Sequence, residues 1–179
     1  SAWGIAFNAS QRLCIEADNT WKQNEPNAGM EGMKAARSIA LISYRHYETY
    51  HASQGEHHIE KIENYKSDSY QRYQGEKLAK RFNAFSYYLL SKGMDSHNVG
   101  RARGGIENAL KRIKAKTIAI GIPTDILFPL SEQEFIAENI EGAQFETIDS
   151  LYGHDGFLLE FEQLHQIIID NLQLSIRGK

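Results

Sequence analysis

Two side chains in the last third of the sequence have the types and surroundings that acyl-transfer chemistry needs. Asp125 lies in the segment Pro123-Thr-Asp-Ile-Leu-Phe-Pro129, and His154 lies in Tyr152-Gly-His-Asp-Gly-Phe157. Acyl transfer uses an imidazole as general base and a carboxylate that holds this imidazole in one tautomer. A short apolar run, typical of a strand, precedes each segment, so we expect two strands to deliver both side chains to one sheet edge. The pair is therefore a candidate for two members of a catalytic triad.

The order of these two residues along the chain matches a known kind of catalytic site. A carboxylate followed by a histidine is the end of the order Ser, Asp, His found in α/β-hydrolases. The nucleophile of such a site sits in a Gly-x-Ser-x-Gly turn, and no such segment occurs among the 179 residues. We therefore predict the C-terminal part of an enzyme, with the serine upstream of Ser1. The alternative is that Asp125 and His154 only stabilise turns in βα loops, where both residue types are common.

The first part of the sequence, up to about residue 113, has the apolar spacing of helices. The residues that show this spacing are Ile5, Ala9, Leu13 and Ala17, then Met33, Ala36, Ala40 and Tyr44, then Tyr70, Tyr73, Leu78, Phe82, Phe85 and Leu89. Breaks are expected at 24–29, which contains Pro and Gly, in the polar stretch 54–64, and at Gly93, which follows a lysine as the end of a helix does. Residues 1–113 are therefore predicted to form an all-helical layer.

From Thr117 the pattern changes to strands that alternate with helices. Predicted strands cover 117–121 and 145–148, and the capping-box spacing Ser131-Glu-Gln-Glu134 predicts a helix to about Ile140. The apolar residues from Phe157 to Leu174 predict a closing amphipathic helix. Since two strands cannot bury their own apolar faces, we expect the sheet to continue in residues outside this sequence. The predicted fold class is α/β, with a last β-α-β-α unit at 114–179 behind the helical layer.

Composition and charge exclude several classes of protein. With 41% hydrophobic and 24% charged residues, the composition is that of an ordinary globular chain. A net charge of −3 supplies no field that would attract nucleic acid or anionic lipid. No apolar run approaches the roughly 20 residues that cross a bilayer. The single cysteine, Cys14, cannot form an internal disulfide, so we expect a cytoplasmic protein.

Five segments spread along the chain resemble the homoserine O-acetyltransferases, which have the α/β-hydrolase fold. They are Ser1-Ala-Trp-Gly-Ile-Ala-Phe-Asn8, Ser69-Tyr-Gln-Arg-Tyr-Gln-Gly-Glu-Lys77, Met94-Asp-Ser-His-Asn-Val-Gly-Arg101, Asp125-Ile-Leu-Phe-Pro129 and Tyr152-Gly-His-Asp-Gly-Phe157. The resemblance implies acetyl transfer from acetyl-CoA, a co-substrate, to L-homoserine through an acyl-serine, as a step toward methionine. It also implies that Asp125 and His154 are the triad acid and base, and that no cofactor is bound. The helical layer, residues 1–113, would be a lid through which homodimers form.

The same resemblance assigns homoserine binding to Arg37, Tyr44 and Asp155, and each residue has a physical reason beside it. A spacing of seven puts Arg37 and Tyr44 on one face of a helix. A guanidinium can hold the α-carboxylate of homoserine with two hydrogen bonds, and the carboxylate of Asp155 can hold the α-ammonium. Taken without the resemblance, Arg37 reads as a solvated charge and Tyr44 as a packing aromatic.

The polar segment Met94-Asp-Ser-His-Asn98 allows a second chemical interpretation. Asp95 and His97 could form another acid-base pair, and Arg101 with Arg103 could hold the phosphates of coenzyme A. The simpler interpretation is a loop whose short polar side chains satisfy its own backbone, and this one is favoured. In the resembled family the loop lies near the entrance of the active site.

A group of histidines suggests a metal site, which we reject. His57 and His58 are adjacent, so their side chains point apart on any regular element, and His51 and Glu56 complete no zinc-ligand spacing. A solvated loop is the favoured interpretation, and we expect no metal site.

Several alternatives to acetyl transfer onto homoserine stay open. A succinyl donor or a serine acceptor would need only small changes near the nucleophile. An esterase-type hydrolase of the same fold would use water as acceptor, although it has no use for a clamp made of Arg37 and Asp155. A non-catalytic helical interaction module is the third possibility. We expect the isolated chain to be inactive because it lacks the nucleophile.

Overall fold

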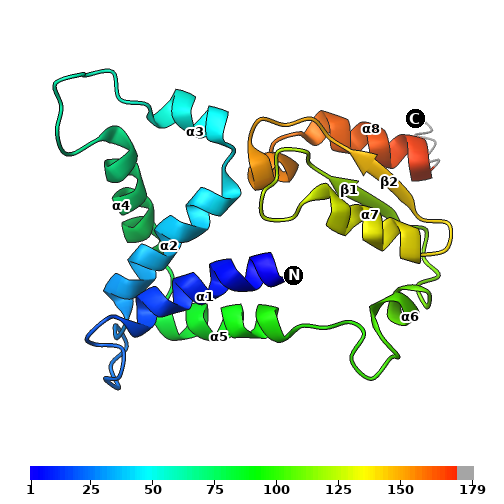
Figure 1. Ribbon diagram of the computed structural model, residues 1–179, viewed down its shortest axis with the longest axis horizontal. Helices are drawn as coiled ribbons and strands as arrows, with labels where there is room; N and C mark the ends of the chain where they lie inside the picture. The colour runs from blue at the N-terminus through cyan, green and yellow to red at the C-terminus, as the bar shows by residue number, and fades with distance from the viewer. Residues whose placement is uncertain (173–179) are drawn as a thin grey trace, which may run out of the picture. The chain divides into compact units, whose positions relative to one another are not determined.

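A computed structural model of the chain describes residues 1–172 (Figure 1). The contacts divide the chain into two compact units, Ser1–His97 and Asn98–Lys179. The change of pattern in the sequence suggested a boundary near residue 113, whereas the contacts place it after His97. The short helix α6 (Ile106–Leu110), expected in the helical half, therefore lies in the second unit. There α6 contacts α7 (Leu130–Asn139). The assignment of residues 1–113 to a lid and a dimer contact stays a prediction.

The first unit consists of helices, as the apolar spacing indicated. They are α1 (Ala2–Glu16), α2 (Met30–Tyr44), α3 (Tyr47–Gln54), α4 (Lys66–Ala79) and α5 (Ala84–Ser96). Helix α2 contacts α1, α4 and α5, and α1 also contacts α5 (Figure 1). The expected end at Gly93 is wrong, because α5 continues to Ser96; a helix tolerates an isolated glycine at a modest cost. The apolar run 70–89 is interrupted between α4 and α5, where the Asn83 side chain caps α5 by accepting from Ser86 N at 2.8 Å.

The core of the first unit forms where α1 crosses α2. The residues buried there are Ile15, Met33, Ala36, Leu78 and Ala84. Gly32 makes the crossing possible: a Cβ at this position would lie 2.6 Å from Ile15 Cα, a backbone atom that cannot move aside. The close approach of the two helices therefore depends on a residue without a side chain.

A carboxylate from the end of α1 satisfies backbone groups at the start of α2. Asp18 Oδ2 accepts from Gly32 N at 2.9 Å, and Oδ1 accepts from Thr20 N at 2.9 Å and Thr20 Oγ1 at 2.7 Å. Thr20 Oγ1 in turn accepts from Gly29 N at 2.9 Å. Burial of this carboxyl acts to raise its pKa, but the hydrogen bonds from Thr20 and Gly32 outweigh burial, so the pKa of Asp18 is lowered.

Replacing Asp18 with alanine is expected to lower the free energy of unfolding by about 1 to 2 kcal/mol at pH 7, because first-turn N–H groups lose their acceptor. A native pKa below the unfolded value stabilises the fold above the unfolded pKa, and this contribution disappears as the pH falls through the native pKa. The difference between wild type and variant should therefore shrink below about pH 4. Urea unfolding followed by circular dichroism, at pH 7 and below about pH 4, measures this difference in the free energy of unfolding.

The matched control is Asp68→Ala, which removes an exposed carboxylate paired with Arg72 at 3.0 Å within α4. Its effect should stay within about 0.5 kcal/mol at either pH. An Asp18→Ala loss of the same size at neutral and acid pH would contradict the assigned role of the carboxylate.

The second unit contains a parallel two-stranded sheet with the expected strand–helix–strand order. Strand β1 (Ile118–Gly121) pairs with β2 (Gln144–Thr147), in a register that sets Ile118 opposite Gln144 and Gly121 opposite Thr147. Helix α7 connects the strands and contacts both of them (Figure 1). The strand predictions at 117–121 and 145–148 are thus confirmed to within one residue. The capping box is wrong: Pro129 is the N-cap of α7, no side chain caps it, and Ser131 lies inside the helix.

The end of the second unit differs from the single helix expected from Phe157 onward. Residues Gly153–Leu158 form a 3₁₀ helix, η1, and α8 (Phe161–Leu172) begins only after it. Phe157 belongs to η1 because the turn starts at Gly153, whose φ of 61° is in the left-handed region that favours glycine. Residues 173 and 174 of the expected helix lie outside the described part of the chain.

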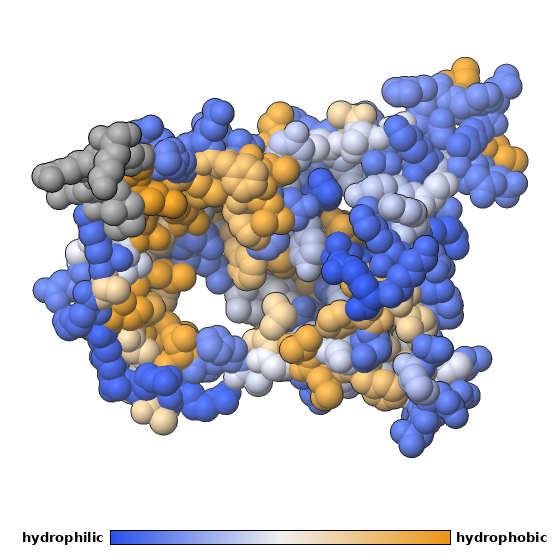
Figure 2. Space-filling model, turned by 180° about the vertical axis from the view of Figure 1, so that it is seen from behind, coloured by the Kyte–Doolittle hydropathy of each residue, from blue (hydrophilic) through white to orange (hydrophobic). Residues whose placement is uncertain are grey.

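Large apolar side chains reach the surface of the second unit. Those in the segments that follow the two strands include Ile126, Phe128, Leu151, Phe157, Leu158, Leu159 and Phe161. Figure 2 shows such hydrophobic surface in several places on the face opposite to that of Figure 1. Both strands of the sheet are edge strands. Among residues 1–172, no helix has the length and apolar character needed to span a membrane.

Candidate active site

Asp125 is held in a tight turn directly after β1. The chain leaves the strand through the buried Ile122, whose carbonyl accepts from Asp125 N at 3.0 Å. Asp125 Oδ1 accepts from Leu127 N at 2.8 Å and from Phe128 N at 3.0 Å. Only 8% of Asp125 is exposed. Oδ1 therefore stabilises the turn, and the turn fixes the orientation of the other oxygen, Oδ2.

His154 lies in η1, which follows β2 along the chain, and its ring contacts the second carboxylate oxygen of Asp125. The distance from His154 Nδ1 to Asp125 Oδ2 is 2.9 Å. The rings of Phe128 and Phe157 lie 5.2 and 5.5 Å from the imidazole, centroid to centroid. The imidazole is 23% exposed and the Asp125 side chain 7% exposed, so the carboxylate is the deeper of the two groups. The expected meeting of the two side chains at one sheet edge is present in the structure.

The contact determines which ring nitrogen is basic. A carboxylate can only accept hydrogen bonds, so the proton of a neutral imidazole lies on Nδ1. The lone pair is then on Nε2, the atom that takes a proton from an attacking hydroxyl in a Ser-His-Asp site. The arrangement of His154 and Asp125 is therefore that of a general base and the residue that orients it.

Contacts between the two loops keep this pair together. Thr124 Oγ1 donates to Ser150 O at 2.7 Å and so joins the Asp125 loop to the segment that leads to His154. Ser150 Oγ accepts from Tyr152 N at 3.2 Å. A Cβ at Gly156 would lie 2.7 Å from Ser150 Cβ and 3.0 Å from Ile122 Cδ1, so only glycine lets η1 pack this closely. Thr124 and Ser150 carry no motif in the sequence that would have predicted their contact.

The sequence of the chain is similar to those of known proteins. No protein-family model matches the chain. A homoserine O-acetyltransferase of Cyclobacterium marinum is 49% identical over 178 residues, which are 99% of this chain and 50% of that protein. One from Thermus thermophilus is 41% identical over 93% of this chain and 42% of its own length.

The chain is a homologue of the homoserine O-acetyltransferases. It spans about half the length of the curated relatives it matches. The resemblance inferred from its five segments is confirmed.

Solved structures establish the fold. The structure of a homoserine O-acetyltransferase from Bacillus anthracis matches with a TM-score of 0.85 at 16% identity, over 99% of this chain and 51% of that one. Esterase E22 matches with a TM-score of 0.83 at 18% identity, over 96% and 51%. An alpha/beta hydrolase enzyme, MGS-M2 from a deep-sea metagenome library, matches with 0.66 at 14% identity, over 100% and 54%. The α/β-hydrolase fold predicted from the sequence is thus confirmed, for about half of such a protein.

Two of the residues expected to bind homoserine lie together on α2. The guanidinium carbon of Arg37 lies 5.6 Å from the ring centroid of Tyr44, so both side chains share one face of the helix as their spacing predicted. Tyr87 of α5 lies near them and donates to Gln11 Oε1. Burial raises the pKa of Tyr87 to about 12, Tyr44 adds to the rise, and Arg37 opposes it. No motif or spacing in the sequence singled out Tyr87 or Gln11.

Asp155, the third residue expected to bind homoserine, follows His154 in the first turn of η1 and is partly buried. Arg37 and Tyr44 belong to the first unit and Asp155 to the second. The binding role of all three in the homoserine O-acetyltransferase reaction stays a prediction.

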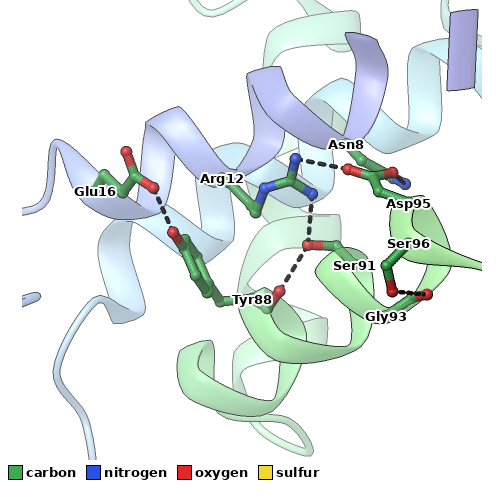
Figure 3. Close-up of polar contacts among 8 residues, drawn as sticks. All are labelled: Asn8, Arg12, Glu16, Tyr88, Ser91, Gly93, Asp95 and Ser96. Atoms are coloured by element: carbon green, nitrogen blue, oxygen red, sulfur yellow. Dashed lines mark hydrogen bonds and ion pairs between the residues drawn. The ribbon is translucent and has the colours of Figure 1, made fainter. Parts of the chain in front are cut away.

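Asp95 binds to two side chains of α1 (Figure 3). Its carboxylate forms an ion pair with Arg12 at 2.6 Å and accepts from Asn8 Nδ2 at 2.7 Å. Arg12 also donates to Ser91 Oγ at 3.1 Å, which completes a bridge between α1 and α5. The carboxylate considered for a second acid-base pair therefore joins two helices of the homoserine O-acetyltransferase homologue.

The loop with the histidines is organised by a carboxylate. Glu56 Oε1 accepts from the backbone N–H groups of His57 and His58, and Oε2 pairs with Lys61 at 2.6 Å. The hydrogen bond from Lys61 lowers the pKa of Glu56 most, the N–H groups add to this effect, and the pKa falls to about 2. Within the described residues, no three His, Cys, Asp or Glu side chains form a group that could hold a metal ion.

Proposed function

We propose that this chain contributes the general base and its orienting carboxylate to a homoserine O-acetyltransferase, which moves an acetyl group from acetyl-CoA to the hydroxyl of L-homoserine. The observation that carries the proposal is the 2.9 Å contact between His154 Nδ1 and Asp125 Oδ2 in an α/β-hydrolase fold. The sequence relatives, which bear the name homoserine O-acetyltransferase, support the choice of acceptor and donor.

In the proposed ping-pong reaction, His154 moves a proton in each half. Nε2 takes the proton of a serine hydroxyl while the serine oxygen attacks the thioester carbonyl of acetyl-CoA. The C–S bond breaks, and the imidazolium returns the proton to the sulfur of coenzyme A. Nε2 then deprotonates the homoserine hydroxyl, which attacks the acetyl-serine, and the serine oxygen leaves with that proton. Asp125 stabilises the imidazolium formed in each half.

The serine and part of the sheet are proposed to come from residues outside these 179. The edge strands β1 and β2 and the exposed apolar side chains around them would pack against that part. In keeping with the family resemblance, we also propose that the helices of the first unit cover the site as a lid and form the contact of a homodimer.

Recognition of homoserine is proposed to rest on its two charges. Arg37 would bind the α-carboxylate, Asp155 the α-ammonium, and Tyr44 would hold the guanidinium in place through their stacking at 5.6 Å. Binding both charges would bring the side-chain hydroxyl of homoserine to a defined distance from His154. A hydrolase that uses water needs no such clamp.

Hydrolysis is the second candidate because esterase E22 is among the solved structures of this fold. Release of coenzyme A from acetyl-CoA, measured with and without L-homoserine, separates the two reactions. The assay needs a protein that joins these residues to the region supplying the serine. Acceleration by homoserine and formation of O-acetylhomoserine support the transferase. Release that is indifferent to homoserine favours the hydrolase, and succinyl-CoA or L-serine as substrates tests the other specificities.

Replacing Arg37 with lysine is expected to lower kcat/KM for homoserine about 10- to 100-fold, since charged hydrogen bonds contribute about 1.5 to 3 kcal/mol. Slow hydrolysis of acetyl-CoA in the absence of homoserine should be unchanged. The matched control is Arg72→Lys, on the exposed side of α4, which should leave both rates unchanged. Equal losses in transfer and hydrolysis would contradict a role of Arg37 in binding homoserine.

A further inference from the structure

The side chain of Gln163 makes a strand-like pair of hydrogen bonds with the backbone of Asp149. Its Oε1 accepts from Asp149 N at 2.9 Å, and its Nε2 donates to Asp149 O at 2.8 Å. Nε2 also lies 3.2 Å from Glu160 Oε2, which orients the amide. Two hydrogen bonds exchanged with one residue are what a neighbouring strand provides in a sheet. The amide therefore pairs with the backbone two residues beyond the end of β2 at Thr147.

Asp149 is the point where the chain leaves the sheet for the segment that carries His154. Ile148 before it is fully buried and donates from its N–H to Gly121 O at 3.1 Å. Ser150 after it accepts from Thr124 Oγ1 at 2.7 Å. Three successive residues are thus held by three different partners: β1, α8 and the Asp125 loop.

These contacts direct the path of the chain into Gly153 and η1. If the hold at Asp149 were lost, the Thr124 contact would remain, and the segment could turn about it. Asp149 is exposed, so water can replace both hydrogen bonds of the lost amide, and the cost in stability is small. The main consequence is greater freedom of the loop that carries the imidazole. A movement well below 1 Å already matters for a hydrogen bond of 2.9 Å.

We infer that Gln163 is a positioning residue for His154: its paired hydrogen bonds to Asp149 hold the imidazole against Asp125. Gln163 itself touches neither the reacting atoms nor the imidazole in any contact described above. The inference deepens the proposed function and, for its effect on rate, rests on it.

The test compares Gln163→Met with Gln163→Glu and with Gln166→Met. Methionine has a similar length but no amide, while glutamate keeps the acceptor for Asp149 N and loses the donor. Gln166 lies one turn further along α8 and donates to Asp170 within the same helix, so its replacement removes an amide without reaching the loop. All variants are made in a protein that also contains the serine region.

Two readouts are measured for each variant. The first is kcat and KM for acetyl transfer to homoserine; misplacement of a catalytic group can cost about 100-fold, so we expect kcat of Gln163→Met to fall about 10- to 100-fold with KM unchanged. The second is the low-field proton resonance of His154 Nδ1–H, which reports the hydrogen bond to Asp125. We expect this resonance to broaden or vanish in Gln163→Met and to persist in Gln166→Met. Gln163→Glu should give intermediate values of both kcat and the resonance.

Unchanged kcat and an unchanged Nδ1–H resonance in Gln163→Met would overturn the inference. A fall in kcat with the resonance intact would also overturn it, because the loss would then come from a general loosening of the fold. If the wild-type protein does not acetylate homoserine, the proposed function is contradicted. Loss of the resonance in Gln163→Met would then still support the positioning role.

Discussion

Asp125→Asn is expected to lower kcat for acetyl transfer by about four orders of magnitude while leaving the fold intact. The asparagine oxygen can still accept from the backbone N–H groups of Leu127 and Phe128, so the turn after β1 should persist. Its amide nitrogen, which can only donate, would then face His154 Nδ1 across 2.9 Å. The imidazole would have to place its lone pair on Nδ1 and its proton on Nε2, the tautomer that cannot accept a proton from an attacking hydroxyl.

Steady-state kinetics with acetyl-CoA and L-homoserine measure the effect, and urea unfolding verifies that the variant is folded. The matched control is Asp170→Asn in α8, where the amide oxygen can still accept from Gln166. It should keep full activity. A folded Asp125→Asn protein that retained more than about a tenth of wild-type kcat would refute the assignment of Asp125 as the residue that orients His154.

Replacing His154 with alanine should remove at least about three orders of magnitude from kcat, since in the proposed reaction the imidazole moves the proton in both halves. Coenzyme A release should fall together with formation of O-acetylhomoserine, because both halves of the proposed reaction use the same imidazole. The alanine also vacates the space between Phe128 and Phe157, whose rings flank the imidazole. Free imidazole added to the assay should therefore restore part of the activity.

His165→Ala is the control, because this histidine is exposed on α8 and its loss should change neither rate. The double variant with Asp125→Asn should be no slower than His154→Ala alone, as residues that act as one unit are not additive. A double variant that lost a further several hundredfold would show that Asp125 contributes independently of the imidazole.

The fold could be predicted from the sequence to the extent that it depends on local patterns. Helical spacing up to Leu89 and the apolar strands at 117–121 and 145–148 are properties of neighbouring residues, and these elements are present. The ends of elements were less predictable: Gly93 lies inside α5, and Phe157 lies in η1 instead of opening α8. The helix tolerates the exposed Gly93 at a modest cost, and the left-handed φ of 61° at Gly153 starts η1 ahead of α8.

By itself the sequence determined the change from helices to alternating strands and helices, the relationship to the homoserine O-acetyltransferases, and the candidate pair of Asp125 and His154. Residue types, periodicity and short motifs carry that information without reference to the fold. Only the tertiary structure decided which atoms meet: Asp95 pairs with Arg12, Thr124 with Ser150, and Gln163 with the backbone of Asp149. The physical reason is that a hydrogen bond needs its two atoms within about 3 Å, and for residues far apart along the chain only packing sets that distance.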